Sequence, residues 1–434
     1  PGGARPWRGG LSAPPSWPWG PRGAAPAGKA AATSAGGGGG GGFFSRLFKR
    51  TGSGRRVDGG ERGPNYDPTN GPQASREVHL TPEEALGVAD FDLLKVVGKG
   101  AFGKVMMVRK KEGNDAGRIF AMKVLKKSVV VAKGQVEHTK TERSVLMEIR
   151  HPYVVCLRYA FQTEDKLYLV TDYYNGGSLF YHLRKSRGFS EGRAKFYAAQ
   201  LLLALEHLHK QHIVYRDLKL ENVLMDHDGH IALTDFGLSK MGVDDSRGAS
   251  TFCGTAEYIA PELLRGLRYG AMVDWWSFGI LLYEMMAGRT PFYDKNRKLM
   301  FYNIINCDPH FPPTFRDSAC RVLRGLLIRD PAERLGGGAA GADAIKSHAF
   351  FSDIDFEALL AKQIAAPYHP DVHSAVDTKY VPKSYLEAEA KDSFVAPNPK
   401  NKGANPDFQE FTYLGETSTI SKQADDDGNE TDEA

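Results

Sequence analysis

The sequence predicts an α+β protein in which a small antiparallel β lobe precedes a larger helical lobe and a C-terminal extension. Short runs rich in β-branched residues are separated by glycine and charged turns, and they lie at 93–97, 105–108 and 119–124. Apolar residues then recur at helical spacing over 136–149, 194–209 and 273–287. After about residue 351 the periodicity weakens into a polar stretch that contains proline.

Composition divides the 434 residues into three regions. Of the 48 glycines, 20 fall before residue 72, and such a segment cannot bury enough apolar surface to offset its chain entropy. We therefore expect a disordered leader at 1–88, a folded domain at 91–351 and an extension at 352–434 that ends in an acidic tail. Residues 43–50 alternate bulky apolar and basic side chains, which suits contact with an anionic membrane, but eight residues are too few for a stable interfacial helix. A plain linker is the favoured interpretation.

The overall charge excludes one class of function. There are 56 Lys and Arg against 52 Asp and Glu, a net +4, so nucleic acid is not expected as the main partner. No apolar run is long enough to span a bilayer, and the four cysteines are dispersed without a CxxC pair. We expect a protein of a reducing compartment, the cytoplasm first and the nucleus as the alternative.

A glycine-rich motif follows the first predicted strand. Gly98, Gly100 and Gly103 have GxGxxG spacing, with Phe102 inside the motif and Val105 after it. A dinucleotide-binding fold would need this motif to open a helix, whereas here a strand continues. A glycine hairpin between strands instead lets backbone amides close over phosphates, because no Cβ atoms intervene, and Phe102 would cap the site.

The next candidate is Lys123, which lies in the apolar run Phe120-Ala121-Met122-Lys123. A buried ammonium group is costly unless it is paired, and both a phosphate and a carboxylate would serve. Glu142, on the predicted helix over 136–149, is the candidate carboxylate. An exposed lysine at a strand end is the alternative.

Four polar residues further along suit phosphoryl transfer. Asp217, Lys219 and Asn222 stand in Tyr215-Arg216-Asp217-Leu218-Lys219-Leu220-Glu221-Asn222, and Asp235 opens Asp235-Phe236-Gly237. This reaction needs a metal on the phosphate oxygens, a cation beside them and a carboxylate that aligns the acceptor hydroxyl. Asp217 would orient the hydroxyl and accept its proton, Lys219 would steady the γ-phosphate, and Asn222 with Asp235 would hold Mg²⁺.

These motifs occur in one order, followed by Ala260-Pro261-Glu262, and residues 91–351 therefore resemble the eukaryotic protein kinase catalytic domain. The finer resemblance is to the AGC group, nearest to protein kinase B, the serum- and glucocorticoid-induced kinases and the ribosomal S6 kinases. It rests on Tyr215 in place of the usual histidine and on the runs at 195–200 and 251–255. Lys219 and Thr255 fit the pattern of serine/threonine kinases.

The resemblance implies further residue roles. Thr251 would be phosphorylated and its phosphate held by Arg216, Lys240 and His138, which would draw the Glu142 helix inward. Residues 167–177 would link the lobes, with Thr171 at the gatekeeper position and backbone groups of Asp172 and Tyr174 facing the adenine of ATP. Ala121, Val105 and either Met225 or Leu224 would supply apolar walls around it. Glu221 and Glu284 would select basic substrates, although Ser178 stands where such relatives carry glutamate. Glu262 and Arg334 would form a buried structural ion pair.

The extension contains Phe408-Gln409-Glu410-Phe411-Thr412-Tyr413, which resembles the hydrophobic motif of AGC kinases. Composition alone would allow a stray apolar cluster. The resemblance implies that Phe408, Phe411 and Tyr413 dock on the small lobe beside the Glu142 helix and that phosphorylation of Thr412 tightens the docking.

The function expected is a serine/threonine protein kinase that uses ATP and Mg²⁺, acts on protein substrates, is activated by an upstream kinase, and is monomeric. A pseudokinase scaffold is disfavoured because Lys123, Asp217 and Asp235 are all present. A kinase of small metabolites is disfavoured by the activation segment over 235–262 and by the hydrophobic motif.

Overall fold

The structure is a computed structural model that describes residues 86–100, 102–243, 248–249, 251, 253–392, 408 and 411–414. Almost all of the expected leader, its segment 43–50 and the acidic tail lie outside these ranges. The described residues all fall within the structural unit that spans Val78–Ala434. In this part of the chain, the helices are too short or too polar to cross a membrane.

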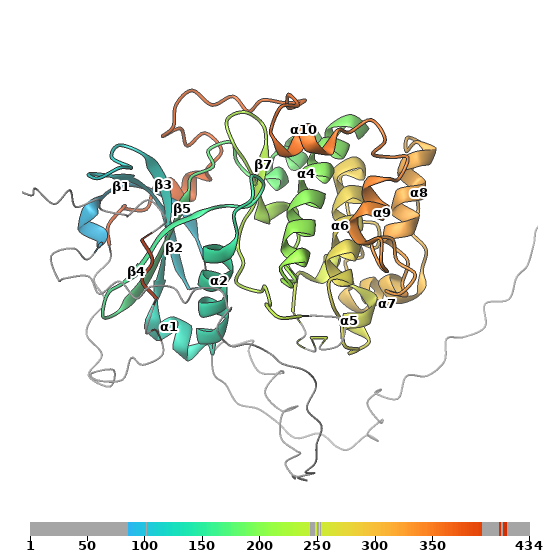
Figure 1. Cartoon of the computed structure of the whole chain (residues 1–434), viewed down its shortest axis with the longest axis horizontal. Helices are drawn as coiled ribbons and strands as arrows, with labels where there is room; N and C mark the ends of the chain where they lie inside the picture. The colour runs from blue at the N-terminus through green and yellow to red at the C-terminus, as the bar shows by residue number, and fades with distance from the viewer. Residues whose placement is uncertain are drawn as a thin grey trace, which may run out of the picture. The chain divides into compact units, whose positions relative to one another are not determined.

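The small lobe is built on one antiparallel sheet with the strand order β1-β2-β3-β5-β4 (Figure 1). The strands are β1 (Phe91–Lys99), β2 (Gly103–Lys110), β3 (Ile119–Lys126), β4 (Leu157–Gln162) and β5 (Lys166–Asp172). The three strand-like runs of the sequence lie inside β1, β2 and β3, as the antiparallel lobe requires. One face buries its own apolar cluster, which includes Phe91, Val96, Phe120 and Tyr168, because side chains alternate between the two faces of a strand.

Two helices follow β3 and precede β4. They are α1 (Lys127–Ala132) and α2 (Val136–Glu148), and the second matches the helix expected over 136–149 to within one residue. Val145 and Leu146 of α2 are buried in the main core, and Glu142 and His138, which lie one to two turns earlier on the same side of the helix, line the cleft between the lobes. The helical spacing therefore decides which residues of α2 can reach the site.

The link between the lobes is shorter than the sequence indicated. Residues 167–172 belong to β5, because Leu167 and Leu169 are buried and the strand pairs with both β3 and β4. Only residues 173–178 connect β5 to the first helix of the large lobe. The expectation of a link over 167–177 was therefore wrong for its first six residues, since a run that is buried on both faces reads like any other apolar stretch.

The large lobe is mainly helical and surrounds α4 and α6 (Figure 1). Its helices are α3 (Leu179–Ser186), α4 (Glu191–Lys210), α5 (Pro261–Leu264), α6 (Met272–Ala287), α7 (Arg297–Asn306), α8 (Asp317–Leu326) and α9 (Gly341–Lys346). A short hairpin of β6 (Val223–Met225) and β7 (Ile231–Leu233) faces the cleft, and 3₁₀ turns occur at Val88–Asp90, Leu220–Asn222 and Ala256–Tyr258. Most of α4 and α6 is buried because these helices are apolar around much of their circumference.

The extension packs on both lobes. Its helix α10 (Phe356–Leu360) contacts α4, and α11 (Lys383–Leu386) contacts β1. Between them, Asn175 Nδ2 donates to the carbonyl of Ser374 at 3.0 Å, so the extension also contacts the link between the lobes. A final segment at 411–414 returns to the free edge of β4, where Tyr413 and Ala160 exchange backbone hydrogen bonds of 2.7 and 2.8 Å.

Candidate active site

A cavity of about 450 Å³ lies between the glycine-rich loop, α2 and the segment that starts at Asp235. Its lining residues are Gly100, Phe102, Gly103, Lys104, Val105, Lys123, Leu125, Gln135, His138, Thr139, Glu142, Asp217, Asp235, Gly237 and Leu238. The loop lies close to β3: a Cβ atom on Gly103 would be 1.8 Å from the carbonyl oxygen of Val124, so only glycine fits there. The lining includes Lys123 and Glu142 from the small lobe and Asp217 and Asp235 from the large lobe, so both lobes contribute charged side chains to one cavity.

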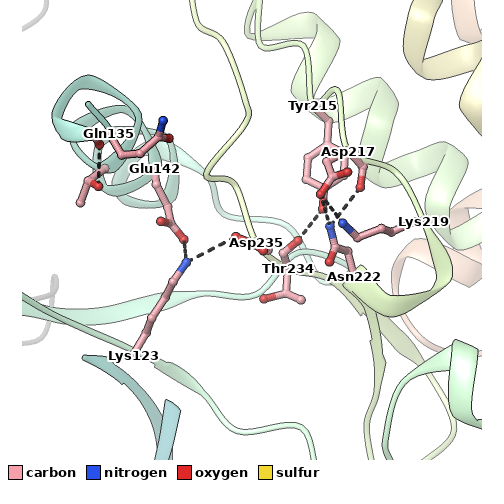
Figure 2. A network of polar contacts seen from close by, with 10 residues as sticks. Lys123, Gln135, Glu142, Tyr215, Asp217, Lys219, Asn222, Thr234 and Asp235 are labelled. Carbon is pink, nitrogen blue, oxygen red and sulfur yellow. Dashed lines mark hydrogen bonds and ion pairs between the residues drawn. The ribbon is translucent and has the colours of Figure 1, made fainter. Parts of the chain in front are cut away.

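Lys123 is paired on the small-lobe side of the cavity, as expected from the sequence. Its Nζ lies 2.6 Å from Glu142 Oε1 and 3.3 Å from Asp235 Oδ1 (Figure 2). Burial alone would lower the pKa of Lys123, but the two carboxylates outweigh it and raise this pKa above its ordinary value. Lys123 is therefore a fixed cation at the cavity wall, and the alternative of a solvated lysine at a strand end does not hold.

Asp217 is the centre of a second polar cluster on the large-lobe side. Its Oδ2 accepts from Lys219 Nζ at 2.6 Å and from Asn222 Nδ2 at 3.0 Å, while its Oδ1 accepts from Thr255 Oγ1 at 2.9 Å. Figure 2 shows Asp217, Lys219 and Asn222 beside Thr234 and Tyr215. Lys219 also donates to Thr255 at 3.2 Å. The Asp217 carboxylate is thus held in one orientation. Thr255 belongs to the site, although the sequence indicated this residue only as part of the serine/threonine-kinase pattern.

The backbone before Asp217 adopts a left-handed conformation, which a buried carboxylate supports. Arg216 has φ of 69°, unusual for a residue other than glycine. The fully buried Asp274 accepts from the backbone N–H groups of Tyr215 at 2.9 Å and Arg216 at 2.8 Å, and it contacts His209 Nε2 at 2.8 Å. The sequence gives no local sign of this role for Asp274, because its partners lie about 60 positions away.

The ligand set suits a divalent cation bound together with phosphates. Nδ2 of Asn222 is used by Asp217, so its carbonyl oxygen is the atom suited to a metal, and Lys123 lowers the pKa of Asp235 and keeps it ionised. Among the described residues, no group of three or more His, Cys, Asp or Glu side chains is gathered to hold an ion. Two hard oxygen ligands fit Mg²⁺, which takes its other ligands from water and nucleotide phosphates.

Of the residues expected around adenine, Val105 lines this cavity and the others do not. Ala121, Thr171, Asp172 and Tyr174 are partly buried, on β3, β5 and the link, and Gly98 of the glycine-rich motif is partly buried on β1 outside the cavity. Met225 is fully buried in the main core, whereas Leu224 is only half-buried. Of the two alternatives, Leu224 is therefore the one with surface to offer a ligand.

The cations expected to hold a phosphate on Thr251 are only partly gathered. The guanidinium of Arg216 donates to the carbonyls of Leu238 and Ser239 and, at 3.0 Å, to the Tyr269 hydroxyl. That hydroxyl donates in turn to the Thr251 carbonyl at 2.7 Å, so Arg216 and Thr251 share a partner.

The other two expected phosphate ligands lie close to this group in different ways. Lys240 is bridged through its backbone to Val214. Nδ1 of His138 contacts Gln135 Oε1 at 2.6 Å, and burial, with the nearby Arg216 charge, lowers the pKa of His138. His138 is thus mainly neutral and held by its own helix.

Three acidic residues, Glu221, Glu257 and Glu284, lie close together in the large lobe. Burial raises the pKa of Glu284 to about 7, although Tyr258 donates a hydrogen bond to it, and the nearby Glu221 and Glu257 raise it further. Sequence reasoning missed Glu257, whose position directly before Tyr258 was the available signal. Ser178 does not join them, because its Oγ accepts from the backbone N–H of Tyr181 at 3.3 Å and caps α3.

The expected hydrophobic motif is docked between α2 and β4. Phe408 and Phe411 are 1% and 2% exposed, and their rings pack edge to face at 6.4 Å. Gln162 Nε2 donates to the Phe408 carbonyl at 2.8 Å, and Arg143 of α2 donates to the carbonyls of Phe411 and Thr412, both at 3.2 Å. A stray apolar cluster would not be buried in this way. The side chain of Thr412 is exposed, and the intervening residues 409 and 410 lie outside the described ones.

Glu262 and Arg334 form the expected buried ion pair in the large lobe. Two parallel contacts of 2.7 and 2.9 Å join the guanidinium to the carboxylate, and the side chains are 0% and 2% exposed for Arg334 and Glu262. Arg334 also donates to the backbone carbonyls of Met272 and Ile328. The pair ties the end of the activation segment to the segment that follows α8.

Comparison with known proteins agrees with this geometry. Residues 91–351 match the family described as the protein kinase domain. The chain is 45% identical over 328 residues to the RAC-beta serine/threonine-protein kinase of Mus musculus, an alignment that covers 75% of this chain and 68% of that protein. It is 48% identical over 337 residues to the RAC family serine/threonine-protein kinase homolog of Dictyostelium discoideum, covering 77% and 74%. The serine/threonine-protein kinase gad8 of Schizosaccharomyces pombe is 47% identical over 328 residues, covering 76% and 57%.

The chain therefore belongs to the protein kinase family, and these relatives place it among the serine/threonine kinases of the AGC group.

Proposed function

We propose that this serine/threonine protein kinase transfers the γ-phosphoryl group of MgATP to basic-directed protein substrates and is activated by phosphorylation of Thr251 and Thr412. The observation that carries the catalytic part is the pair of charged clusters across one cavity. Lys123, Glu142 and Asp235 form the first, and Asp217 with Lys219 the second. Such an arrangement provides the cation, the metal ligands and the oriented carboxylate that phosphoryl transfer requires.

Each residue has a role that follows from its contacts. Lys123, kept cationic by two carboxylates, would bind phosphate oxygens of the nucleotide. Bound Mg²⁺, held by Asn222 and Asp235, would neutralise charge on the phosphates. Asp217 would accept the proton of the substrate hydroxyl, because Thr255 and Asn222 fix its orientation without neutralising it. Lys219 would stabilise the charge on the transferred group.

The catalytic assignment is tested by removing the base while its shape is kept. Asp217→Asn should lower peptide phosphorylation by about 100-fold or more, the range for loss of a positioned base, while ADP still binds. Asp228→Asn is the matched control, since this aspartate side chain is 66% exposed and forms no contact with the cavity. Unchanged turnover in Asp217→Asn would overturn the proposed mechanism and would favour a scaffold that binds nucleotide only.

Regulation through Thr251 is supported by the hydrogen-bond chain from Thr251 through Tyr269 to Arg216. A phosphate on Thr251 adds about −1.5 to −2 charge beside Arg216, one residue from Asp217. An upstream kinase is the partner this implies. Thr251→Ala should lose most activity and keep ADP binding, whereas wild-type activity of a fully activated preparation of this variant would contradict the role.

Basic-directed specificity is supported by the acidic group of Glu221, Glu257 and Glu284. The capping role of Ser178 leaves one acidic contact out, so we expect a weaker preference for arginine upstream of the phosphorylated residue than relatives with glutamate there. A positional peptide library tests this expectation: a strict requirement for arginine three residues upstream would contradict it. We further propose that the protein acts as a monomer in the cytoplasm.

A further inference from the structure

Arg158 occupies an irregular position in the small-lobe sheet. In the pairing of β4 with β5, Leu157 lies opposite Thr171 and Tyr159 lies opposite Val170, so Arg158 is an extra residue in β4. Such a bulge redirects its side chain out of the regular alternation of the strand. Here the redirected side chain reaches the end of β5.

The guanidinium of Arg158 forms a two-pronged contact with Asp172. Arg158 Nε lies 2.9 Å from Asp172 Oδ1, and Arg158 NH2 lies 3.0 Å from Asp172 Oδ2. These hydrogen bonds raise the pKa of Arg158 above its ordinary value. A planar fork fixes the direction of a carboxylate as well as its position, which a single point charge does not. The backbone N–H of Asp172 is also held, by the Cys156 carbonyl at 3.2 Å.

Asp172 stands at the junction of the sheet and the link between the lobes. It is the last residue of β5 and lies opposite Phe120, three residues along β3 from Lys123, a distance of about 10 Å along a strand. The other end of the link is held by the large lobe, where Gly176 and Met225 share a backbone hydrogen bond of 2.9 Å. Arg158 thus fastens the small-lobe end of a short segment whose far end is already fixed.

We propose that Arg158 is a positioning residue for the base of the nucleotide: by clamping Asp172 it orients the peptide groups that begin the link between the lobes. This inference rests on the proposed function and on the family resemblance, which implies that backbone groups of Asp172 and Tyr174 face adenine. A pre-oriented backbone binds a ligand more tightly because less ordering is left to occur on binding. Arg158 itself does not touch the cavity.

A second arginine reinforces the clamp from another strand connection. Arg118, just before β3, lies 3.7 Å from Asp172 Oδ1, and its guanidinium covers the Phe120 ring at 5.3 Å. Arg118 also pairs with Asp115, which accepts from the Tyr159 hydroxyl at 2.6 Å. Since its contact to Asp172 is longer and one-pronged, Arg118 should contribute less than Arg158.

The test compares adenosine and ADP binding, by calorimetry, in Arg158→Met, Arg158→Lys and Arg109→Met. The Met variant removes the fork and keeps much of the aliphatic stem, and the Lys variant keeps the charge without the fork. Arg109 is an exposed arginine of β2 and controls for loss of charge on the same lobe. The clamp is partly exposed, since the side chains of Arg158 and Asp172 are 36% and 24% accessible. We therefore expect Arg158→Met to lower the affinity for both ligands by only about three- to fivefold.

The pattern across ligands identifies the cause. Equal weakening of adenosine and ADP, poor rescue by lysine, and a raised KM for ATP with kcat and the peptide KM unchanged support the clamp. Weakening of ADP alone, with full rescue by lysine, would mean that Arg158 acts only as a long-range charge on the phosphates, and the proposal would be wrong. Unchanged affinity for both ligands would also overturn it.

A double variant provides a second test that does not depend on one substitution. If the two side chains act as a unit, Arg158→Met combined with Asp172→Asn should bind adenosine no more weakly than Asp172→Asn alone. Additive losses would contradict the clamp. A wild-type chain that binds neither adenosine nor ADP would instead refute the proposed function, so the two failures are distinguishable.

Discussion

The conformation of the catalytic segment depends on one buried carboxylate, that of Asp274. Three donors converge on it, namely the backbone N–H groups of Tyr215 and Arg216 and the Nε2 of His209, all within 2.9 Å. Asp274→Asn keeps the size of the side chain but replaces one acceptor oxygen by an NH2 group. Whichever way the amide is turned, at least one donor then faces another donor.

The loss of stability expected for Asp274→Asn follows from the hydrogen bonds that this substitution removes or weakens. A hydrogen bond to a charged group contributes about 1.5–3 kcal/mol, so the loss of one such bond and the weakening of the others should lower the free energy of unfolding by about 3 kcal/mol. The left-handed backbone of Arg216 is a conformation that itself costs about 1–3 kcal/mol, and it persists only where its surroundings enforce it. Asp217 follows directly, and a displacement of about 1 Å at a reacting group lowers a rate by about 100-fold.

Steady-state kinetics at saturating ATP, combined with urea unfolding and ADP titration, would measure these effects. We expect kcat of Asp274→Asn to fall by about 10- to 100-fold, within the range for a displaced reacting group. ADP affinity should stay near that of the wild type, because Lys123 is positioned from the other lobe. His209→Gln is the comparison, since it changes only the side-chain donor and should have a smaller effect. A kcat within twofold of the wild type would refute the reasoning, as would equal losses in kcat and ADP affinity.

Three further predictions concern other parts of the molecule. Burial raises the pKa of Glu284 from its ordinary 4.5 to about 7. Between these pH values the folded state therefore retains a proton that the unfolded state releases. The contribution of Glu284 to the free energy of unfolding should be fully present below pH 4.5 and be lost as the pH rises through 7. Glu284→Gln should remove that part of the slope in urea unfolding at a series of pH values, and an unchanged slope would count against the burial argument. Phe411→Ala deletes a ring that is 2% exposed, which should remove about 3–5 kcal/mol of packing free energy. We expect residues 411–414 to undock and kcat to fall. Slow hydrogen exchange retained at the Tyr413 backbone amide would disprove undocking. Glu262→Gln leaves Arg334 buried without its countercharge and should reduce stability by about 3–5 kcal/mol, whereas a loss below 1 kcal/mol in urea unfolding would show that the pair is dispensable.

Sequence reasoning succeeded where one residue type has one physical use at a given spacing. The glycines at 98, 100 and 103, the lysine at 123 and the acidic residues at 217 and 235 indicate phosphate chemistry by their type and spacing alone. The helix over 136–149 was recognisable because its apolar residues follow a 3.6-residue period. Sequence reasoning failed at the link between the lobes, because the apolar run at 167–172 is equally consistent with a strand and with a buried connection.

Residues with long-range partners were beyond such reasoning. Thr255, Asp274 and Glu257 have ordinary local surroundings, and their roles appear only when segments distant in the chain meet. The clamp of Arg158 on Asp172 depends on a bulge, and a bulge is a property of how two strands are registered. Neither residue has a motif of its own.

The sequence by itself determined the order of the secondary structure, the chemical groups of the site and the membership of the chain in its family, because local periodicity and the spacing of reactive residues are properties of the chain. Only the tertiary structure decided which charges neutralise one another, which backbone segments are strained and supported, and where the end of the extension is seated. Those outcomes depend on burial and on distances between remote segments, and both arise only when the two lobes and the extension pack together.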